Sequence, residues 1–499
     1  MKMTYLLRSS TFFFLMSFLL FQACDKPTTE EPEDSYFGLP TLLAGEPQVD
    51  AILLQARLVA SDTLIDNDLP GREGFARFEL STDADFKQSK QSSWMPARPE
   101  NDYIIKWEAD SLEPNQRYYY KIAYGSKEEV TTYSHTQTFK TLPGKEKEEL
   151  VSFVMVTGSH YERFYMGGNF GKGKPSSQGA GPYTEADAGL GFPNLEAIES
   201  KMPDFYIGNG DNVYYDHPGF DKATKLPEMR AKWHRLFNMD RMTSLMGSVP
   251  AYWMKDDHDH RFDDSDTLPS SKKHGNDPSH ELGVNTFIEQ VPVPSKTYRT
   301  HRISKDLQIW MAEGRDFRSP NNMEDGPEKT MWGKEQMAWL KNSLLESDAT
   351  FKLLVTPTPM VGPDDKRKTD NHTNPGGFKV EGDAFFDWLK ANGFLQKNFY
   401  ILCGDRHWQY HSTHPSGFEE FSCGSQVDQN SRLGKLPGDE NSTDPEGLIQ
   451  QPYTSKEPSG GFLMVKLGYP NDRPVLRFEF FDEKGNLLYE TEKVKIRAH

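Results

Sequence analysis

Four short apolar runs of this chain are each followed, within a few residues, by acidic, histidine or tyrosine side chains. The side chains concerned are His160, then Asp211 and Tyr214, then Asp257 and His258, and finally Asp405 and His407. Imidazole nitrogens and carboxylate oxygens together are ligands for divalent and trivalent metal ions. A single Asp-x-His pair is weak evidence, but the same arrangement after four runs predicts a metal site with donors for one ion or two.

These residue types also suggest a reaction. Tyr214 could add a phenolate oxygen next to Asp211, and such a ligand favours a ferric ion. Two ions that share one carboxylate would hold a hydroxide near neutral pH and present it to an electrophilic phosphorus. His258 would then remain as a general acid for the leaving oxygen. Simpler interpretations stay open, because residues 256–266 could form a solvated acidic loop and His407 could be a hydrogen-bonded core histidine.

The apolar runs that position these side chains are predicted to be buried strands. The run at 399–403 is too short for a typical helix and is cut by Gly404. The other three runs occupy residues 151–156, 204–207 and 250–254. Because open α/β sheets place their sites at the carboxyl ends of strands, the four strand ends are predicted to face one crevice.

Helical patterns alternate with these strands. The helical core stripes are Met229, Trp233 and Phe237, and Met337, Leu340 and Leu344, while further strand-like runs occupy 307–311, 351–355, 462–467 and 475–480. This alternation indicates a layered α/β domain over residues 150–499, which ends in a β segment. Long loops near 165–183 and 364–382 are predicted to border a substrate cleft.

The region from 38 to 143 shows a β pattern throughout. Ala76, Phe78 and Leu80 alternate with polar residues, as expected for a half-buried antiparallel strand. The segment from Leu112 to Tyr118 is similar to the turn into a late strand of fibronectin-type sandwiches. We therefore expect an immunoglobulin-like β-sandwich here, followed by a charged linker at 144–149.

The first 37 residues are predicted to be a targeting segment and a tether. Basic residues precede an apolar stretch that ends at Cys24, which is typical of a bacterial lipoprotein signal over residues 1–24. A cleaved signal with an incidental cysteine is the alternative. Residues 25–37 have little to bury and are predicted to be a disordered acidic tether. The chain is thus expected in the cell envelope, periplasmic or surface-exposed, and attached to the outer membrane through a lipid only.

Composition narrows the remaining classes of protein. The 499 residues are 36% hydrophobic and 12% aromatic, which suffices for more than one core. A net charge of −17 argues against a nucleic-acid binder, which normally presents a basic face. Beyond Cys24 only Cys403 and Cys423 remain, and their number and spacing suggest neither a disulfide framework nor a zinc ribbon.

In this order, the four motifs resemble those of the alkaline phosphatase D family of calcineurin-like metallophosphatases. Segments 45–47, 141–143 and 332–340 are also similar to parts of that family, so the likeness covers nearly the whole chain after Cys24. The resemblance implies an immunoglobulin-like domain followed by a four-layer αββα metallophosphatase domain. It also implies a metal-dependent phosphoric ester hydrolase, with two or more ions. Iron and calcium are favoured by the resemblance, and zinc or manganese is an alternative.

The resemblance also implies roles for single residues. His160 takes the place of a cysteine ligand, Asp211 is the expected bridging ligand, Tyr214 and Asp257 are further ligands, and Asp405 and His407 form the last ligand pair. His258 is the expected catalytic histidine and Arg315 the residue that stabilises the phosphoryl oxygens, although Arg315 and Arg318 could instead be surface ion-pair formers. Glu313 replaces an aspartate of the family, and Asp263, Asp264 and Asp266 could serve an additional hard cation such as calcium.

Three functions remain compatible with the sequence. The first is hydrolysis of phosphate esters with a metal-held hydroxide as nucleophile. The second is a surface lipoprotein that binds a glycan or a phosphorylated polymer and whose catalytic site is retired. The third is a hydrolase of another ester, such as a sulfate ester. The sequence leaves open the preference between monoesters and diesters, the natural substrate, the metal and the oligomeric state.

Overall fold

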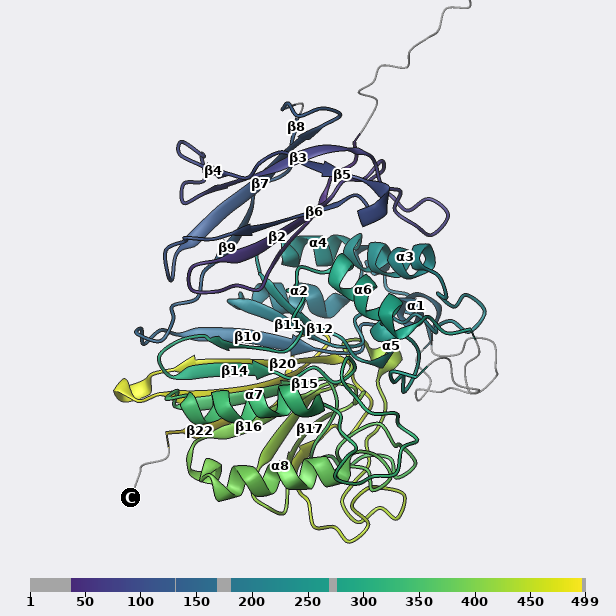
Figure 1. Ribbon diagram of the computed structural model, residues 1–499, viewed down its shortest axis with the longest axis vertical. Helices are drawn as coiled ribbons and strands as arrows, with labels where there is room; N and C mark the ends of the chain where they lie inside the picture. The colour runs from purple at the N-terminus through teal and green to yellow at the C-terminus, as the bar shows by residue number, and fades with distance from the viewer. Residues whose placement is uncertain (1–36, 131, 168–180, 269–275, 496–499) are drawn as a thin grey trace, which may run out of the picture. The chain divides into compact units, whose positions relative to one another are not determined.

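The computed structural model describes residues 37–130, 132–167, 181–268 and 276–495 (Figure 1). The predicted signal, Cys24 and the tether up to residue 36 lie outside these ranges, as does most of the predicted loop at 165–183. In the described parts of the chain, no helix is both long and apolar enough to cross a lipid bilayer.

The first sheet has nine strands in the order β22-β21-β20-β10-β11-β12-β1-β2-β6. Its strands are β1 (Thr41–Gly45), β2 (Ile52–Arg57), β6 (Ile104–Ala109), β10 (Val151–Val156), β11 (Phe205–Asn209), β12 (Ala251–Met254), β20 (Gly461–Gly468), β21 (Val475–Asp482) and β22 (Leu487–Val494). Strands β10, β11 and β12 run parallel, so their carboxyl ends lie at the same edge. The strands predicted at 151–156, 204–207 and 250–254 are confirmed as β10, β11 and β12, and their bounds differ from the predicted ones by at most two residues.

The second sheet has seven strands in the order β13-β14-β15-β16-β18-β17-β19. Its strands are β13 (Arg299–Arg302), β14 (Leu307–Met311), β15 (Phe351–Thr356), β16 (Phe399–Cys403), β17 (Gln409–Thr413), β18 (Glu419–Cys423) and β19 (Gln450–Thr454). Strands β14, β15 and β16 are parallel neighbours. The predicted bounds of β14 and β16 agree with the structure.

The two sheets pack face to face, and helices cover their outer faces (Figure 1). Phe153, Ile207 and Leu353 belong to the apolar core between the sheets. On the first sheet lie α2 (Pro193–Ser200), α3 (Leu226–Phe237), α4 (Asp240–Met246) and α6 (His280–Gln290); on the second lie α7 (Gly333–Glu346) and α8 (Lys379–Ala391). Trp233 of α3 and Leu340 of α7 are fully buried, as the helical stripes predict. The structure thus confirms the four-layer αββα arrangement.

A third sheet completes a β-sandwich at the N-terminal side. It contains β3 (Gly74–Ser81), β4 (Lys90–Gln91), β5 (Met95–Ala97), β7 (Arg117–Gly125), β8 (Thr132–Tyr133) and β9 (Gln137–Lys140), and its apolar face packs on β1, β2 and β6. The backbone N–H of Glu113 donates a 2.8 Å hydrogen bond to the Tyr118 hydroxyl, and Leu112 is buried. This contact confirms the fibronectin-type corner.

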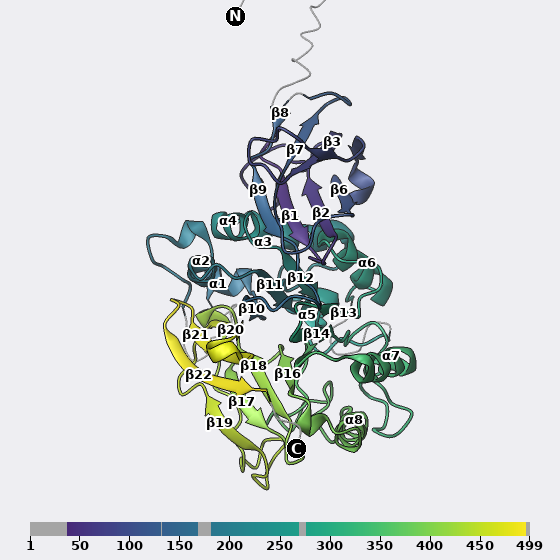
Figure 2. The same cartoon turned by 90° about the vertical axis from the view of Figure 1, so that its left-hand side faces the viewer.

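The sandwich is joined to the first sheet by strand pairing, which the sequence did not predict. Gly45 of β1 pairs in parallel with Ala251 of β12, so the two strands belong to one sheet (Figure 2). Next to this pair, the buried carboxylate of Glu46 accepts a 2.8 Å hydrogen bond from Nε of Arg299. The sandwich therefore continues the sheet that carries β10 to β12.

Short helices complete the described chain. They are α1 (Tyr161–Met166), α5 (Asp257–His260), η1 (Pro99–Asn101), η2 (Ala188–Leu190), η3 (Phe394–Gln396), η4 (Asp428–Asn430) and η5 (Pro470–Asp472). The acidic stretch at 256–266 is not the solvated loop that was one interpretation. It begins as α5, whose four side chains are all buried.

Candidate metal centre

The strand ends of both sheets meet where the predicted ligands lie. A Cβ atom on Gly404, which follows β16, would lie 2.5 Å from the backbone oxygen of Asn209 at the end of β11. Only glycine allows this approach of the two sheets. Asp211 and Asp405 both adopt left-handed backbone conformations, with φ of 53° and 56°. Such conformations are uncommon for residues other than glycine and cluster at functional sites.

A first group of donors combines a phenol, a carboxylate and an imidazole. The Tyr214 hydroxyl lies 3.1 Å from Oδ2 of Asp211 and 3.4 Å from Nε2 of His407. The same Nε2 atom lies 3.7 Å from Oδ2 of Asp211. Asn430 donates a 2.9 Å hydrogen bond to the Tyr214 hydroxyl and fixes its position. These three donors come from both sheets and could hold one ion.

A second group shares one member with the first. Ligand atoms of Asp211, Asp257 and His258 all lie within 4.8 Å of one another, and all three residues are buried. Asp211 therefore belongs to both groups, and this is the position that its predicted bridging role requires. The bridging itself stays a prediction, as does the choice of His258 as acid or ligand.

Buried carboxylate oxygens without a hydrogen-bond partner indicate that this site fits a cation. Oδ1 of Asp211 and Oδ1 of Asp257 are buried and have no hydrogen-bond partner among the described residues. Burial raises the pKa of Asp211 well above its usual range, and the carboxylates of Asp257 and Asp256 add to this while His258 opposes it. Buried oxygens of this kind are costly unless a donor or an ion satisfies them. Hard oxygen and imidazole donors at this density suit a metal ion.

A third acidic group adjoins the second. Asp257, Asp263 and Asp264 offer oxygens within 4.8 Å of one another. Lys368 lies beside them, paired with Asp264 and 3.7 Å from Oδ1 of Asp263. The ammonium group thus already neutralises part of the charge that was predicted to serve an additional cation. Asp266 is not in the group, since its carboxylate accepts the N–H groups of Leu268 and Asn321.

His258 is held by a carboxylate that the sequence analysis missed. Its Nδ1 atom lies 2.7 Å from Oδ1 of Asp216. Burial lowers the pKa of His258, but Asp216, Asp257 and Asp211 outweigh this and raise it well above the usual range. The motif 211–214 is followed within two residues by Asp216, and this acidic residue was the available signal.

His160 and Asp405 lie near the centre but outside the groups just described. The His160 ring stacks on Tyr214 at 3.8 Å, its Nε2 atom lies 2.7 Å from Nδ1 of His217, and its Nδ1 atom accepts the N–H of Arg163. Burial lowers the pKa of His160 well below its usual range, which keeps the ring neutral. Asp405 pairs with Arg406. Their metal-binding roles stay predictions.

Arg315 does not line the cleft, contrary to its predicted contact with the phosphoryl group. Its side chain is fully buried, with Nε 2.6 Å from Oδ1 of Asp256 and NH2 3.8 Å from Oδ1 of Asp257. Glu313 accepts the backbone N–H of Arg315 at 2.7 Å and pairs with Lys255 at 3.0 Å. In this geometry Arg315 positions the two aspartates, and Glu313 in turn positions Arg315.

An open cleft of about 570 Å³ gives access to both donor groups. It is lined by Arg163, Tyr214, Asp216, His217, Gly219, Lys222, Asp257, His258, Asp263, Lys368, Asp405, His407, Asn430 and Arg432. Lys368 belongs to the loop at 364–382 that was predicted to border a cleft. The sequence did not identify His217, Asn430 or the four basic residues Arg163, Lys222, Lys368 and Arg432 as functional residues, because none of them directly follows one of the four strands.

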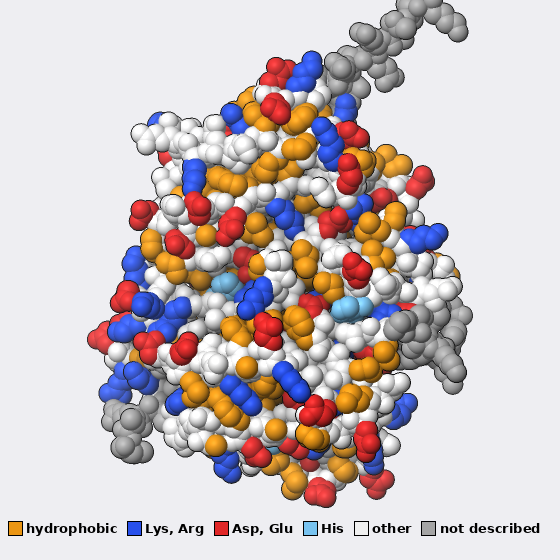
Figure 3. Space-filling model, in the orientation of Figure 1, with side chains coloured by type: hydrophobic (Ala, Val, Ile, Leu, Met, Phe, Trp, Pro, Cys, Tyr) orange, Lys and Arg blue, Asp and Glu red, His pale blue; other side chains and the backbone are white. Residues whose placement is uncertain are grey.

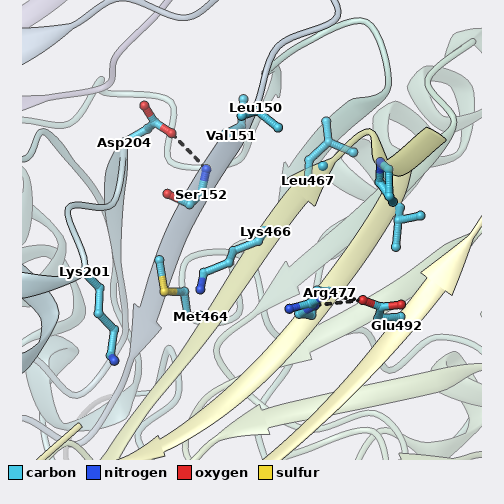
Figure 4. Close-up of a pocket in the computed structure, with 13 residues that line it drawn as sticks. Leu150, Val151, Ser152, Lys201, Asp204, Met464, Lys466, Leu467, Arg477 and Glu492 are labelled. Carbon is cyan, nitrogen blue, oxygen red and sulfur yellow. Dashed lines mark hydrogen bonds and ion pairs between the residues drawn. The ribbon is translucent and has the colours of Figure 1, made fainter. Parts of the chain in front are cut away.

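A second cavity lies away from this centre. It measures about 370 Å³ and is lined by residues such as Val151, Met464 and Arg477 (Figure 4). Val151 begins β10, whereas His160 follows its carboxyl end, so the two sites are at opposite ends of the sheet. None of the potential metal groups of the described residues includes a residue that lines this cavity.

Comparisons with known proteins agree with this architecture. The profile of the PhoD-like phosphatase family matches residues 153–451, and that of its N-terminal domain matches residues 26–143. The chain is 22% identical over 417 residues to alkaline phosphatase D of Bacillus subtilis (strain 168), covering 76% of this chain and 66% of the relative. It thus spans just under two thirds of that relative's length.

Two solved structures share the fold. A structure of PhoD aligns with a TM-score of 0.69 and 17% identity over 92% of this chain and 91% of that one. A purple acid phosphatase, PPD1 from yellow lupin (Lupinus luteus) seeds, aligns with a TM-score of 0.57 and 12% identity over 91% of this chain and 74% of that one. At these identities they show the fold alone. With the family profile matched over most of the chain, this protein belongs to the PhoD-like phosphatase family.

Proposed function

We propose that this protein is a metal-dependent hydrolase of phosphoric esters. The observation that carries the proposal is the position of Asp211, which is shared by two donor groups and keeps one buried oxygen without a partner. Membership of a phosphatase family supports the same reaction class. The related protein named alkaline phosphatase D points in the same direction.

The donor groups indicate which residues would hold the ions. Tyr214, Asp211 and His407 would bind one ion, and Asp211 with Asp257 would bind a second. When bound, such ions supply Lewis acidity toward phosphoryl oxygens and water. The mixture of one phenol, imidazole and carboxylates suits iron as well as zinc or manganese, so the metal is left to direct analysis.

The remaining residues of the site donate a proton or hold other side chains in position. His258 directs Nδ1 toward Asp216, which leaves Nε2 free to donate a proton to the departing alkoxide when the phosphorus–oxygen bond breaks. Asp216 fixes the ring orientation in the way that a carboxylate orients a catalytic imidazole. Arg315 holds Asp256 and Asp257 in place. His258 is therefore the catalytic residue of the proposal, and Arg315 and Asp216 are positioning residues.

A combined metal and activity measurement tests the proposal. The purified full chain should hydrolyse p-nitrophenyl phosphate or bis-p-nitrophenyl phosphate, lose that activity to a chelator and contain metal by elemental analysis. Asp211→Asn and His407→Gln should each lower both metal content and activity, whereas Asp85→Asn, at an exposed site in the sandwich, should change neither. Activity that persists in a double variant of Asp211 and His407 would refute the assignment of the centre.

A further inference from the structure

Two arginines of the cleft form no ion pair with any carboxylate of the described residues. Arg163 belongs to α1 and Arg432 follows η4, and both line the cleft. Among the described residues, no carboxylate lies within ion-pair distance of either guanidinium group. The Nε atom of Arg163 is buried and has no hydrogen-bond partner in the described chain. The sequence from 168 to 180, just after α1, contains no acidic residue.

Three other cations in and around the centre are matched by acidic groups. Arg315 is bound to Asp256, Arg406 to Asp364, and Lys368 to Asp264. A charge that is partly removed from water is normally paired in this way, because desolvation of an unpaired ion is costly. Arg163 and Arg432 depart from that pattern, and so does Lys222, which lines the same cleft and lies over the Phe262 ring.

The backbones of both arginines are anchored to residues in or near the centre. The backbone N–H of Arg163 donates to Nδ1 of His160 at 3.2 Å, and that of Arg432 donates to the carbonyl oxygen of His407 at 3.0 Å. The guanidinium group of Arg432 lies over the Trp408 ring, 4.8 Å from its centroid. Helix α1 also packs against η4, so the two arginines come from neighbouring elements.

The two groups are also close enough to influence the same surroundings. Burial lowers the pKa of Arg432 to about 10; Arg406 adds to this effect, Asp364 and Asp365 oppose it, and Arg163 makes a smaller contribution that lowers the pKa. The two guanidinium groups thus add positive charge to a cleft that is also lined by Asp216, Asp257, Asp263 and Asp405. On the face shown in Figure 3, acidic and basic side chains are interspersed.

We infer that Arg163 and Arg432 bind the non-bridging oxygens of the substrate phosphate and select dianionic phosphomonoesters over monoanionic phosphodiesters. The inference rests on the proposed function. A guanidinium group matches two phosphate oxygens at once, and hydrogen bonds between charged groups are the stronger ones. A phosphomonoester carries three terminal oxygens and a charge of about −1.5 to −2 at pH 7. A diester presents only two such oxygens and a single charge, so it gains less from two unpaired guanidinium groups.

The test compares two esters with the same leaving group in wild type and variants of the full, metal-loaded chain. In Arg163→Gln and Arg432→Gln, kcat/KM for p-nitrophenyl phosphate should fall about 10- to 100-fold. For bis-p-nitrophenyl phosphate the fall should stay within about threefold. Arg432→Lys keeps the positive charge but loses the guanidinium group that can bind two phosphate oxygens at once. Its kcat/KM for p-nitrophenyl phosphate should therefore lie between those of wild type and Arg432→Gln. Arg477→Gln, at the exposed position of strand β21 and paired with Glu492, is the matched control and should leave both values unchanged.

Binding of inorganic phosphate gives a second measurement that does not depend on turnover. Its Kd, from calorimetry on metal-loaded protein, should rise by the same factor in both glutamine variants while metal content and melting temperature remain those of wild type. Equal losses for the two esters, or an unchanged phosphate Kd, would overturn the inference. If the wild type hydrolyses neither ester, the proposed function fails, and phosphate binding then tests the arginine pair alone. If a glutamine variant does not fold, Arg163→Lys and Arg432→Lys decide through the ratio of the two esters.

Discussion

Oδ1 of Asp216 lies 2.7 Å from Nδ1 of His258, and this contact fixes the imidazole ring at the wall of the cleft. Asp216 is buried, so the hydrogen bond is shielded from water. The pair links the loop after β11 to α5 after β12 and therefore couples two of the strand ends. Because Nδ1 faces Asp216, the contact also sets the direction in which Nε2 of His258 points.

Replacement of this carboxylate should affect turnover more than binding. In Asp216→Asn the side chain keeps its size but no longer stabilises an Nδ1–H group as a charged acceptor would. We expect kcat to fall about 10- to 100-fold with little change in KM. Steady-state kinetics on p-nitrophenyl phosphate measure this. Asp221→Asn, at an exposed position nearby, serves as the control, and a rise in KM alone would contradict the orienting role.

Removal of metal should destabilise the protein through the shared ligand. A ligand that binds only the folded state raises the melting temperature, so a chelator should lower that of the metal-loaded chain. In Asp211→Asn the protein should already melt at the lower temperature, and the chelator should have no further effect. Differential scanning calorimetry with elemental analysis checks this. A chelator effect of wild-type size in this variant would show that Asp211 is not a ligand.

The buried position of Arg315 separates a structural role from a substrate contact. Arg315→Gln leaves Asp256 and Asp257 without their cation, and loss of one partner of a buried ion pair costs about 3–5 kcal/mol of folding free energy. We expect the melting temperature and the metal content to fall while the fraction that is folded and metal-loaded binds inorganic phosphate with unchanged Kd. Normal stability together with weakened phosphate binding in this variant would instead support the contact between Arg315 and the phosphoryl group that the sequence predicts.

The junction of the two halves should show its own pH dependence. His234 of α3 lies 2.6 Å from Oδ2 of Asp102 in the sandwich, and Arg57 lies 3.0 Å from Oδ1. Burial raises the pKa of Asp102, but His234 and Arg57 together outweigh this effect and lower the pKa. A carboxylate with a lowered pKa in the folded state stabilises it above the unfolded pKa of about 3.9 and loses this contribution as the pH falls through the folded value.

Asp102→Asn should therefore reduce stability by about 3–5 kcal/mol at neutral pH. The difference from wild type should stay constant above about pH 5 and shrink below about pH 4. Melting temperatures between pH 3 and pH 7 would measure it. Asp110→Asn, in an exposed pair with Lys90, should show no comparable difference. A difference in melting temperature between Asp102→Asn and wild type that stays the same from pH 7 down to pH 3 would indicate that the variant loses only packing.

The strands and the strand-end ligands were predictable because local sequence determines them. The run at 399–403 is apolar and is closed by Gly404, so both its type and its end follow from the chain itself. The parallel order of β10, β11 and β12 then brings Asp211 and Asp257 to one edge. The buried stripe of α3 follows from the helical period in the same way.

The missed residues depend on contacts between segments far apart in the sequence. Arg163 and Arg432 become neighbours only because α1 packs against η4, and neither position has a spacing that distinguishes it from a surface arginine. Burial of Arg315 has the same origin, since its acidic partners include residues from β12 to α5 and Asp370 of a distant loop. Pairing of Gly45 with Ala251 likewise joins two strands that lack any complementary pattern.

This pairing has a consequence for any shortened version of the protein. A fragment that starts at residue 150 would lose β1 and uncover the side of β12, together with its unpaired backbone groups. Exposed strand edges recruit strands from other molecules, and such fragments tend to aggregate. It would also leave His234 on α3 without both of its acidic partners. The sandwich thus covers an edge of the catalytic domain, and we expect a fragment without the sandwich to aggregate where the full chain does not.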